Sequence, residues 1–144
     1  MIRVKVTTTV KPTEDLDKVK KAVLNVFNGE IMVIEEGNGY YRIEGFSTSR
    51  DSLDKLYNLI RIEQIIPAAR NYLLRNTRGR YITILLHKQA AYVNKISFID
   101  SEHESPLGAI RIEIETDNPS ELIDWLAPPY MPRRKRRRQD KLEK

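Results

Sequence analysis

The sequence contains no cysteine among its 144 residues, and this absence excludes several kinds of protein. A disulfide framework, a thiolate nucleophile and a cysteine-based zinc site all require that residue. The chain also has no apolar run of 18 residues, and its first ten residues alternate in character instead of forming a signal peptide. We therefore expect a soluble, cytoplasmic protein with no membrane partner.

Short catalytic and nucleotide-binding motifs are missing as well. The six glycines form neither a phosphate-binding loop, nor a dinucleotide fingerprint, nor the Gly-x-Ser-x-Gly turn of a hydrolase. One of the two histidines, His103, lies between Glu102 and Glu104, but adjacent loop residues rarely converge on one metal ion. We predict a protein that is not an enzyme and needs no cofactor or metal. A small hydrolase or metal enzyme around His103 is the weaker alternative.

The positive charge is concentrated in two places. Residues 131–144 carry eight Lys or Arg against two acids, a net charge of +6, whereas residues 1–130 have a net charge of −1. Within the larger part, residues 61–99 hold seven Lys or Arg against the single acid Glu63. A length of 130 residues suits one hydrophobic core. We predict one domain at residues 1–130 and a polybasic tail at residues 131–144.

The first part of the domain shows clear periodic patterns. Apolar and polar residues alternate over residues 2–10, as in a half-buried strand. A helix is predicted to follow, with Thr13 as its N-cap and Asn28 and Gly29 at its end. Residues 30–36 and 40–46 are predicted to pair as a hairpin, because Gly-Asn-Gly between them tolerates positive φ.

The remainder favours two helices, three strands and a short helix. Pro67 separates a helix after residue 51 from one that runs to Asn76, and residues 77–79 are predicted to be a loop. Strands are predicted at residues 81–86, 96–99 and 110–114, while residues 88–94 suit either a helical turn or a bent strand. Asn118 and Pro119 begin the last helix. This order predicts an α+β fold, a mostly antiparallel sheet with helices packed on it.

The two basic regions suggest contacts with RNA phosphates and bases. Arginines surround a predicted helix end and the loop after it, and Tyr72, Tyr81 and Tyr92 are interleaved with them. Tyrosines at such positions are also common in cores, and cations near a helix C-terminus stabilise the helix without any ligand. Candidate RNA contacts in the domain are Arg70, Arg75, Arg78, Arg80, Lys88, Gln89 and Lys95. Those in the tail are Arg133, Arg134, Lys135, Arg136, Arg137 and Arg138.

The tail has other possible roles. A run of six cations binds phosphates with strong salt dependence and little sequence preference. The same run suits a solubilising end, an anionic membrane surface or an acidic protein partner. It could also neutralise residues 100–124, which hold eight acids against Arg111. No hydrophobic anchor lies beside the run, which disfavours the membrane.

Several short stretches resemble one known family. They are Pro-Thr-Glu-Asp at 12–15, Ala-Ala-Arg at 68–70, Lys-Gln-Ala-Ala at 88–91, Ser-Pro-Leu-Gly at 105–108 and Ile-Asp-Trp-Leu-Ala-Pro at 123–128. In order and spacing they resemble an archaeal family of uncharacterised proteins regarded as RNA-binding, with a fold like the large-subunit ribosomal protein that binds the smaller ribosomal RNA. The resemblance covers residues 1–128 and implies a ribosomal-protein-like α+β fold and a homodimer. The polybasic tail lies beyond it.

The leading hypothesis is therefore a non-catalytic, homodimeric RNA-binding protein associated with the ribosome or with RNA processing. The domain surface would recognise RNA shape, and the tail would add nonspecific affinity for phosphates. The rival hypothesis is a structural or assembly protein whose basic tail docks on an acidic protein partner.

Overall fold

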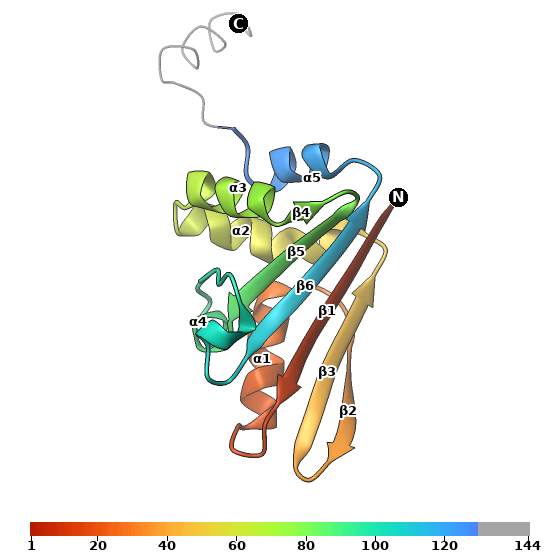
Figure 1. Ribbon diagram of the computed structural model, residues 1–144, viewed down its shortest axis with the longest axis vertical. Coiled ribbons are helices and arrows are strands. Elements are labelled where there is room, and N and C mark those ends of the chain that lie inside the picture. Colours follow the sequence, from red (N-terminus) through yellow and green to blue (C-terminus); the bar gives the residue numbers. More distant parts are fainter. Residues whose placement is uncertain (130–144) are drawn as a thin grey trace, which may run out of the picture.

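The computed structural model describes residues 1–129 as a single sheet with helices packed against it (Figure 1). The strands are β1 (Ile2–Val10), β2 (Ile31–Gly37), β3 (Tyr40–Ser47), β4 (Thr77–Arg78), β5 (Tyr81–His87) and β6 (Ala109–Thr116). The helices are α1 (Leu16–Val26), α2 (Asp54–Ile62), α3 (Ile66–Arg75), α4 (Lys88–Tyr92) and α5 (Pro119–Leu126), with 3₁₀ turns η1 (Arg50–Leu53) and η2 (Glu102–Glu104). The polybasic tail lies outside the described residues.

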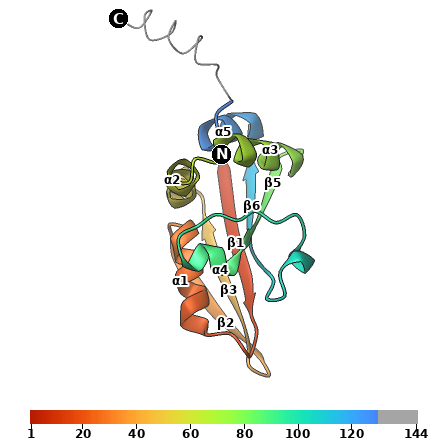
Figure 2. The same cartoon turned by 90° about the vertical axis from the view of Figure 1, so that its left-hand side faces the viewer.

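The sheet has the order β2-β3-β1-β6-β5-β4, and every neighbouring pair is antiparallel. The predicted α+β fold is confirmed. No helix within residues 1–129 is long and apolar enough to cross a membrane. In two perpendicular views, α3, α5 and β4 lie at one end of the molecule, and α1 and α4 lie side by side toward the other (Figures 1 and 2).

One face of the sheet builds the core because its strands alternate in register. Gly45, Val6, Ile112 and Ile84 stand next to one another on β3, β1, β6 and β5, and all four are buried. Phe27, which follows α1, packs onto this row where Gly45 leaves room: a Cβ at Gly45 would lie only 2.7 Å from the Phe27 ring. Burial of such a ring contributes about 1.5–3 kcal/mol. The glycine is therefore a packing requirement of the core.

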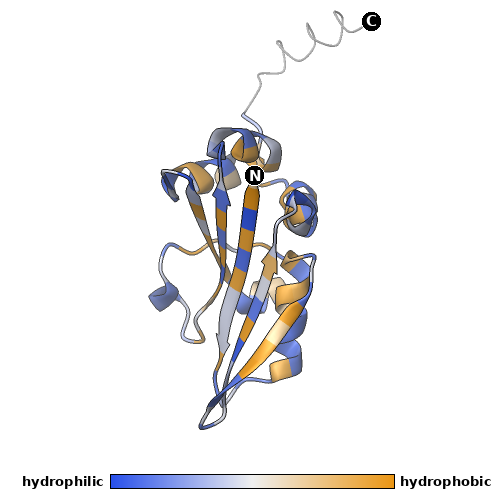
Figure 3. Cartoon of the chain, turned by 90° about the vertical axis from the view of Figure 1, so that its right-hand side faces the viewer, coloured by the Kyte–Doolittle hydropathy of each residue, from blue (hydrophilic) through white to orange (hydrophobic). Residues whose placement is uncertain are grey.

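The other face of the sheet is polar and carries charges of both signs. Lys5 pairs across the ladder with Glu113, and Arg3 pairs with Glu115. Figure 3 shows the resulting alternation of hydrophobic and hydrophilic residues along β1, and a hydrophobic stretch in the edge strand β2. This alternation explains how β1 occupies the centre of the sheet with only one face in the core.

The first helix begins two residues later than the sequence analysis predicted. Asp15, not Thr13, is the N-cap, because its carboxylate accepts hydrogen bonds from the backbone N–H groups of Asp17 and Lys18 at 2.9 and 3.4 Å. Glu14 does not lie in the first turn; its side chain turns inward. An aspartate competes well with threonine for the cap position.

Two other local predictions were wrong. Residues 96–99 are not a strand, because only one isolated bridge, between Phe98 and Leu86, joins them to β5. Residues 77–79 are not only a loop, since Thr77 and Arg78 form the short strand β4. The ambiguous segment after β5 is the helix α4. The predicted hairpin turn is confirmed, with positive φ at Gly37, Asn38 and Gly39.

Candidate nucleic-acid interface

Three of the predicted arginines gather at the end of the molecule that carries α3. Arg75 is the last residue of α3, Arg78 belongs to β4, and Arg80 lies in the turn between β4 and β5. The Arg78 guanidinium donates to the backbone carbonyl oxygen of Arg75 at 3.0 Å, which places the Arg78 side chain beside the end of α3. All three are exposed. We call Arg75, Arg78 and Arg80 the α3–β4 rim.

Acidic side chains already accompany two members of the α3–β4 rim. Arg75 contacts Asp100 at 3.3 Å, and Arg80 contacts Asp117 at 2.5 Å. Because at least half of each of these side chains is exposed, the pairs contribute little stability. A phosphate can therefore replace the carboxylate at small cost. The acids of residues 100–124 thus pair with the central arginines, a possibility that the charge count did not suggest.

Arg70 belongs to α3, and its side chain reaches the C-terminal end of α5. Its guanidinium donates to Asp124 at 2.7 Å and to the carbonyl oxygen of Ala127 at 3.1 Å. Arg61 donates to the carbonyl oxygens of Leu126 and Trp125 at 3.0 and 3.1 Å. The last carbonyls of a helix have no partner within the helix. Arg61 and Arg70 therefore supply the hydrogen bonds that end α5 and join it to α2 and α3.

A stack of flat groups reinforces the same junction. The Trp125 ring stacks on the Tyr57 ring with centroids 4.8 Å apart. The Arg50 guanidinium lies 4.4 Å from the Trp125 centroid, and the Arg61 guanidinium lies 3.3 Å from the Tyr57 centroid. Trp125 thus packs between Tyr57 and Arg50, which favours a structural role over stacking on an RNA base.

Lys88 lies inside the fold, not on its surface. Its side chain is 5% exposed, and its ammonium group donates to the Glu14 carboxylate at 3.1 Å and to the carbonyl oxygens of Leu107 and Thr9. Three donors therefore have three partners. Burial lowers the pKa of Lys88, and the hydrogen bond to Glu14 opposes that shift only in part. Because protein acceptors engage all three donors of this ammonium group, it has none left for an RNA phosphate.

Gln89 and Lys95 are exposed, on α4 and just after it. They are remote from the α3–β4 rim, because α4 and the rim lie at opposite ends of β5 (Figure 1). At about 3.3 Å per residue, the strand separates Arg80 from Lys88 by roughly 25 Å. The structure thus divides the predicted domain contacts into two groups.

The three interleaved tyrosines differ in how exposed they are. Tyr72 is buried, stacks on Phe98 with centroids 4.4 Å apart, and donates its hydroxyl to the carbonyl oxygen of Ile99. Desolvation raises the pKa of Tyr72. Tyr81 is 53% exposed on β5, and Tyr92 is half-buried beside α1. Only the last two are therefore accessible to a ligand.

Sequence reasoning missed three lysines on α1. Lys18, Lys20 and Lys21 have no ion-pair partner among residues 1–129, and α1 packs directly beside α4. Acids close to these lysines in the sequence almost cancel their charge when the net charge is counted segment by segment. The burial of Glu14 against Lys88 removes one of those acids from the surface. Lys88 is buried with Glu14, so the net charge of the α1–α4 side is unchanged, and the three α1 lysines without an acidic partner among residues 1–129 supply its positive charge.

The alternative site around His103 is not assembled in the described part of the chain. Glu102, His103 and Glu104 form the exposed turn η2, and the Glu104 carboxylate accepts a hydrogen bond from the backbone of Asp100. Within residues 1–129, no three His, Asp or Glu side chains are grouped to hold a metal ion.

Comparison with known proteins places this arrangement in a family. The model of a family described as RNA binding matches residues 3–116. The chain belongs to this RNA-binding family. It is also 46% identical over 129 residues to a UPF0201 protein of Aeropyrum pernix, covering 89% of this chain and 86% of that one. A UPF0201 protein of Metallosphaera sedula is 45% identical over 128 residues, covering 89% of both chains.

Solved structures agree with the family assignment. The crystal structure of a UPF0201 protein from Methanococcus jannaschii is similar with a TM-score of 0.78 and 34% identity, covering 90% of this chain and 96% of that one. A DUF54 protein from Methanothermobacter thermautotrophicus shares the fold at a TM-score of 0.55 and 18% identity, covering 87% and 91% of the two chains. The matched archaeal relatives support the resemblance to an archaeal RNA-binding family.

A first prediction concerns Arg61. Arg61 bonds two carbonyls of α5 while its flat guanidinium lies on the Tyr57 ring, and a lysine ammonium cannot make both contacts. Arg61→Lys is therefore expected to lower the free energy of unfolding by about 1–3 kcal/mol. Arg78→Lys makes the same chemical change at an exposed site and is expected to stay within about 0.5 kcal/mol of wild type. Urea denaturation measures both. Equal stability of the two variants would contradict the helix-ending role of Arg61.

A second prediction concerns the buried pair. Lys88→Met leaves the Glu14 carboxylate unpaired with 7% exposure, which is expected to cost about 3–5 kcal/mol. The double variant Lys88→Met/Glu14→Leu removes both charges and is expected to recover much of that loss. Recovery is measured by urea denaturation of the single and double variants. No recovery would mean that the two groups stabilise the fold independently.

The pair also predicts a pH dependence. Because the folded pKa of Lys88 is lowered, the unfolded chain keeps this proton to a higher pH than the folded chain. Between the two pKa values the unfolded state binds more protons, so folding becomes more favourable as pH rises toward the ordinary lysine pKa of about 10.4. The stability of wild type relative to the double variant is expected to increase over that range, and a flat or falling difference would contradict the burial effect.

Proposed function

We propose that this protein binds RNA without catalysing a reaction, and that the α3–β4 rim contacts the phosphate backbone. The single observation that carries the proposal is the gathering of Arg75, Arg78 and Arg80 at one exposed end of a chain that belongs to an RNA-binding family. Guanidinium groups bind phosphate oxygens with two parallel hydrogen bonds. The exposed pairs of Arg75 with Asp100 and of Arg80 with Asp117 are weak, so both guanidinium groups can exchange a carboxylate for a phosphate.

The tail is proposed to act together with the α3–β4 rim. The described residues end at Pro129, after α5, at the end of the molecule that carries α3 and β4 (Figure 1), and the tail follows them in the sequence. Six consecutive cations add affinity for any phosphate backbone, whereas arginines on a rigid helix end and turn favour particular RNA shapes. A function at the ribosome or in RNA processing belongs to the same proposal.

We also propose that two copies pair through β2. This strand is an edge of the sheet, and its Met32 and Val33 side chains are 62% and 36% exposed. Phe46 on the neighbouring strand is 61% exposed. Exposed hydrophobic edges usually find a partner strand. An antiparallel β2–β2 contact about a two-fold axis would cover this edge symmetrically.

The RNA proposal is tested by replacing the α3–β4 rim. Changing Arg75, Arg78 and Arg80 to Gln is expected to reduce the magnitude of the slope of log affinity against log salt by roughly two to three, at about 0.7–0.9 per phosphate contact. Deleting residues 131–144 is expected to reduce the slope further and to weaken binding most at low salt. Fluorescence anisotropy with labelled RNA hairpins and single strands measures both effects.

The matched control removes the same charge elsewhere. Arg3, Arg42 and Arg111 lie on the polar face of the sheet, and each is paired with a glutamate. Changing all three to Gln is expected to alter the slope of log affinity against log salt by less than about one. Equal losses for both triple variants would mean that only net charge matters. No RNA binding above an acidic control protein at low salt would refute the function and favour docking of the tail on an acidic protein.

The homodimer is tested by light scattering. Met32→Glu places a charge at the proposed contact and is expected to produce a monomer, whereas Leu74→Glu, at a 50% exposed site on α3, is expected to leave the dimer mass unchanged. A wild-type protein that is monomeric at micromolar concentration would rule out the pairing.

A further inference from the structure

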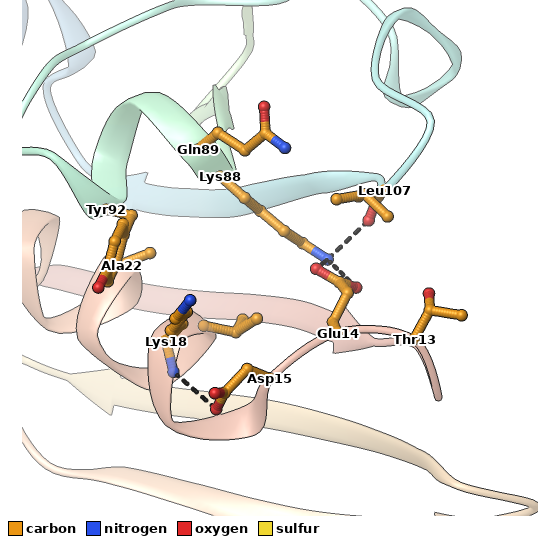
Figure 4. A pocket seen from close by; sticks show the side chains of 10 residues that line it. Thr13, Glu14, Asp15, Lys18, Ala22, Lys88, Gln89, Tyr92 and Leu107 are labelled. Carbon is orange, nitrogen blue, oxygen red and sulfur yellow. Dashed lines mark hydrogen bonds and ion pairs between the residues drawn. The ribbon is translucent and has the colours of Figure 1, made fainter.

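A cleft between α1 and α4 lies away from the α3–β4 rim. It encloses about 220 Å³. An apolar cavity of about 150 Å³ holds a benzene molecule, so this cleft has room for one larger flat ring. Figure 4 shows the side chains that surround it, with α4 on one side and α1 on the other.

The walls of the cleft consist mainly of carbon. Val19 and Ala22 come from α1, Tyr92 comes from α4, and Leu107 comes from the segment before β6. The aliphatic stem of Lys88 crosses between them (Figure 4). Apolar walls with one aromatic ring suit a flat, weakly polar group, in the way that aromatic side chains take up unstacked bases.

Apart from the Lys88–Glu14 ion pair, the polar side chains lie mainly at the mouth of the cleft. Gln89 and Lys18 stand there on opposite helices, with Thr13 and Asp15 along the α1 side (Figure 4). The Gln89 amide both donates and accepts hydrogen bonds, as the edges of nucleobases do. Lys18 lines the cleft, and the Lys21 ammonium lies 5.1 Å from the centroid of the Tyr92 ring, so both bring positive charge to where the phosphates of a bound strand would lie.

The interior does not favour an anion. Lys88 is the cation that lines the cleft from within, but Glu14 neutralises it and two carbonyl oxygens take its remaining donors. A phosphate inside would meet the Glu14 carboxylate without an available cation to bind. The same ion pair joins the two sides of the cleft and keeps its shape in the absence of ligand. The cleft is therefore preformed for a neutral ring.

We infer that the α1–α4 cleft holds one unpaired nucleobase of a bound RNA strand, with Gln89 contacting the edge of the base and Lys18 a neighbouring phosphate. This inference rests on the proposed RNA-binding function and adds a second contact about 25 Å along β5 from the α3–β4 rim. A duplex keeps its bases stacked and cannot fill the cleft, so the site selects single-stranded segments, loops or bulges.

Methyl NMR of the full-length protein tests the inference directly. Ring currents of an inserted base are expected to shift the methyl signals of Val19 and Ala22, which line the cleft, while Ile114 in the core stays unchanged. The probes are six-nucleotide oligoadenylate and oligouridylate, an RNA duplex of equal charge, and adenosine monophosphate. Anisotropy with the same RNAs records binding independently of the cleft.

Variants separate the cleft from general attraction. Gln89→Ala is expected to weaken single-strand binding about fivefold, the equivalent of one hydrogen bond, without changing duplex binding. Asn58→Ala, an exposed amide on α2, is the matched control and is expected to have no effect. Lys18→Ala is expected to reduce single-strand binding more than Lys20→Ala, although both remove one charge from α1.

The outcomes are distinguishable. Val19 and Ala22 shifts with single strands, but not with the duplex, support the inference. Single-strand binding by anisotropy without those shifts overturns it and leaves the RNA-binding function standing. Equal shifts with the duplex, or shifts with adenosine monophosphate at lower concentration than with either strand, also overturn it. Absence of binding to every RNA refutes the proposed function itself.

Discussion

The buried ion pair between Lys88 and Glu14 is the interaction that connects the separate parts of this fold. Lys88 begins α4, Glu14 precedes α1, and the two other acceptors, the carbonyl oxygens of Thr9 and Leu107, lie at the end of β1 and just before β6. Three stretches of the chain, residues 9–14, Lys88 and Leu107, thus meet at one ammonium group. Desolvating two charges is costly, so the pair is a demanding way to hold a structure together. In the folded protein it links α4 to the start of α1, and the cleft lies between these two helices.

Charge has two distinct uses in this chain. Arg61 and Arg70 donate hydrogen bonds to backbone carbonyls at the end of α5, and Lys88 forms a buried ion pair in the core. The arginines of the α3–β4 rim make only exposed pairs, and the α1 lysines have no acidic partner within residues 1–129. Net charge per segment does not separate these uses. Burial and hydrogen bonding separate them, because a buried cation whose donors are all hydrogen-bonded to the protein has no donor available for a phosphate.

The sequence was sufficient for the features that depend on local periodicity. Alternation predicted β1 and β6, Gly-Asn-Gly predicted the hairpin turn, and Pro67 predicted the break between α2 and α3. The failure that matters most for the site depends on contact between remote segments. Lys88 looked like a surface residue because its partner Glu14 lies 74 positions away. Asp15 and not Thr13 is the cap of α1, and the inward position of Glu14 beside Lys88 depends on a contact that no local rule contains. Most of the proposed base-binding cleft was invisible for the same reason.

The place of β1 in the sheet has a consequence for how the protein is made. β1 is the first strand to leave the ribosome, yet it stands at the centre of the sheet and pairs with β6, the last strand. The hydrogen bond from Thr8 to Ala109 alone spans 101 positions. Until residue 116 has been synthesised, β1 lacks its β6 neighbour, and the edge that β6 covers in the folded protein is open. Such edges bind other strands readily, and distant pairing is slow to form. This edge of β1 is thus available for mispairing until β6 has been made.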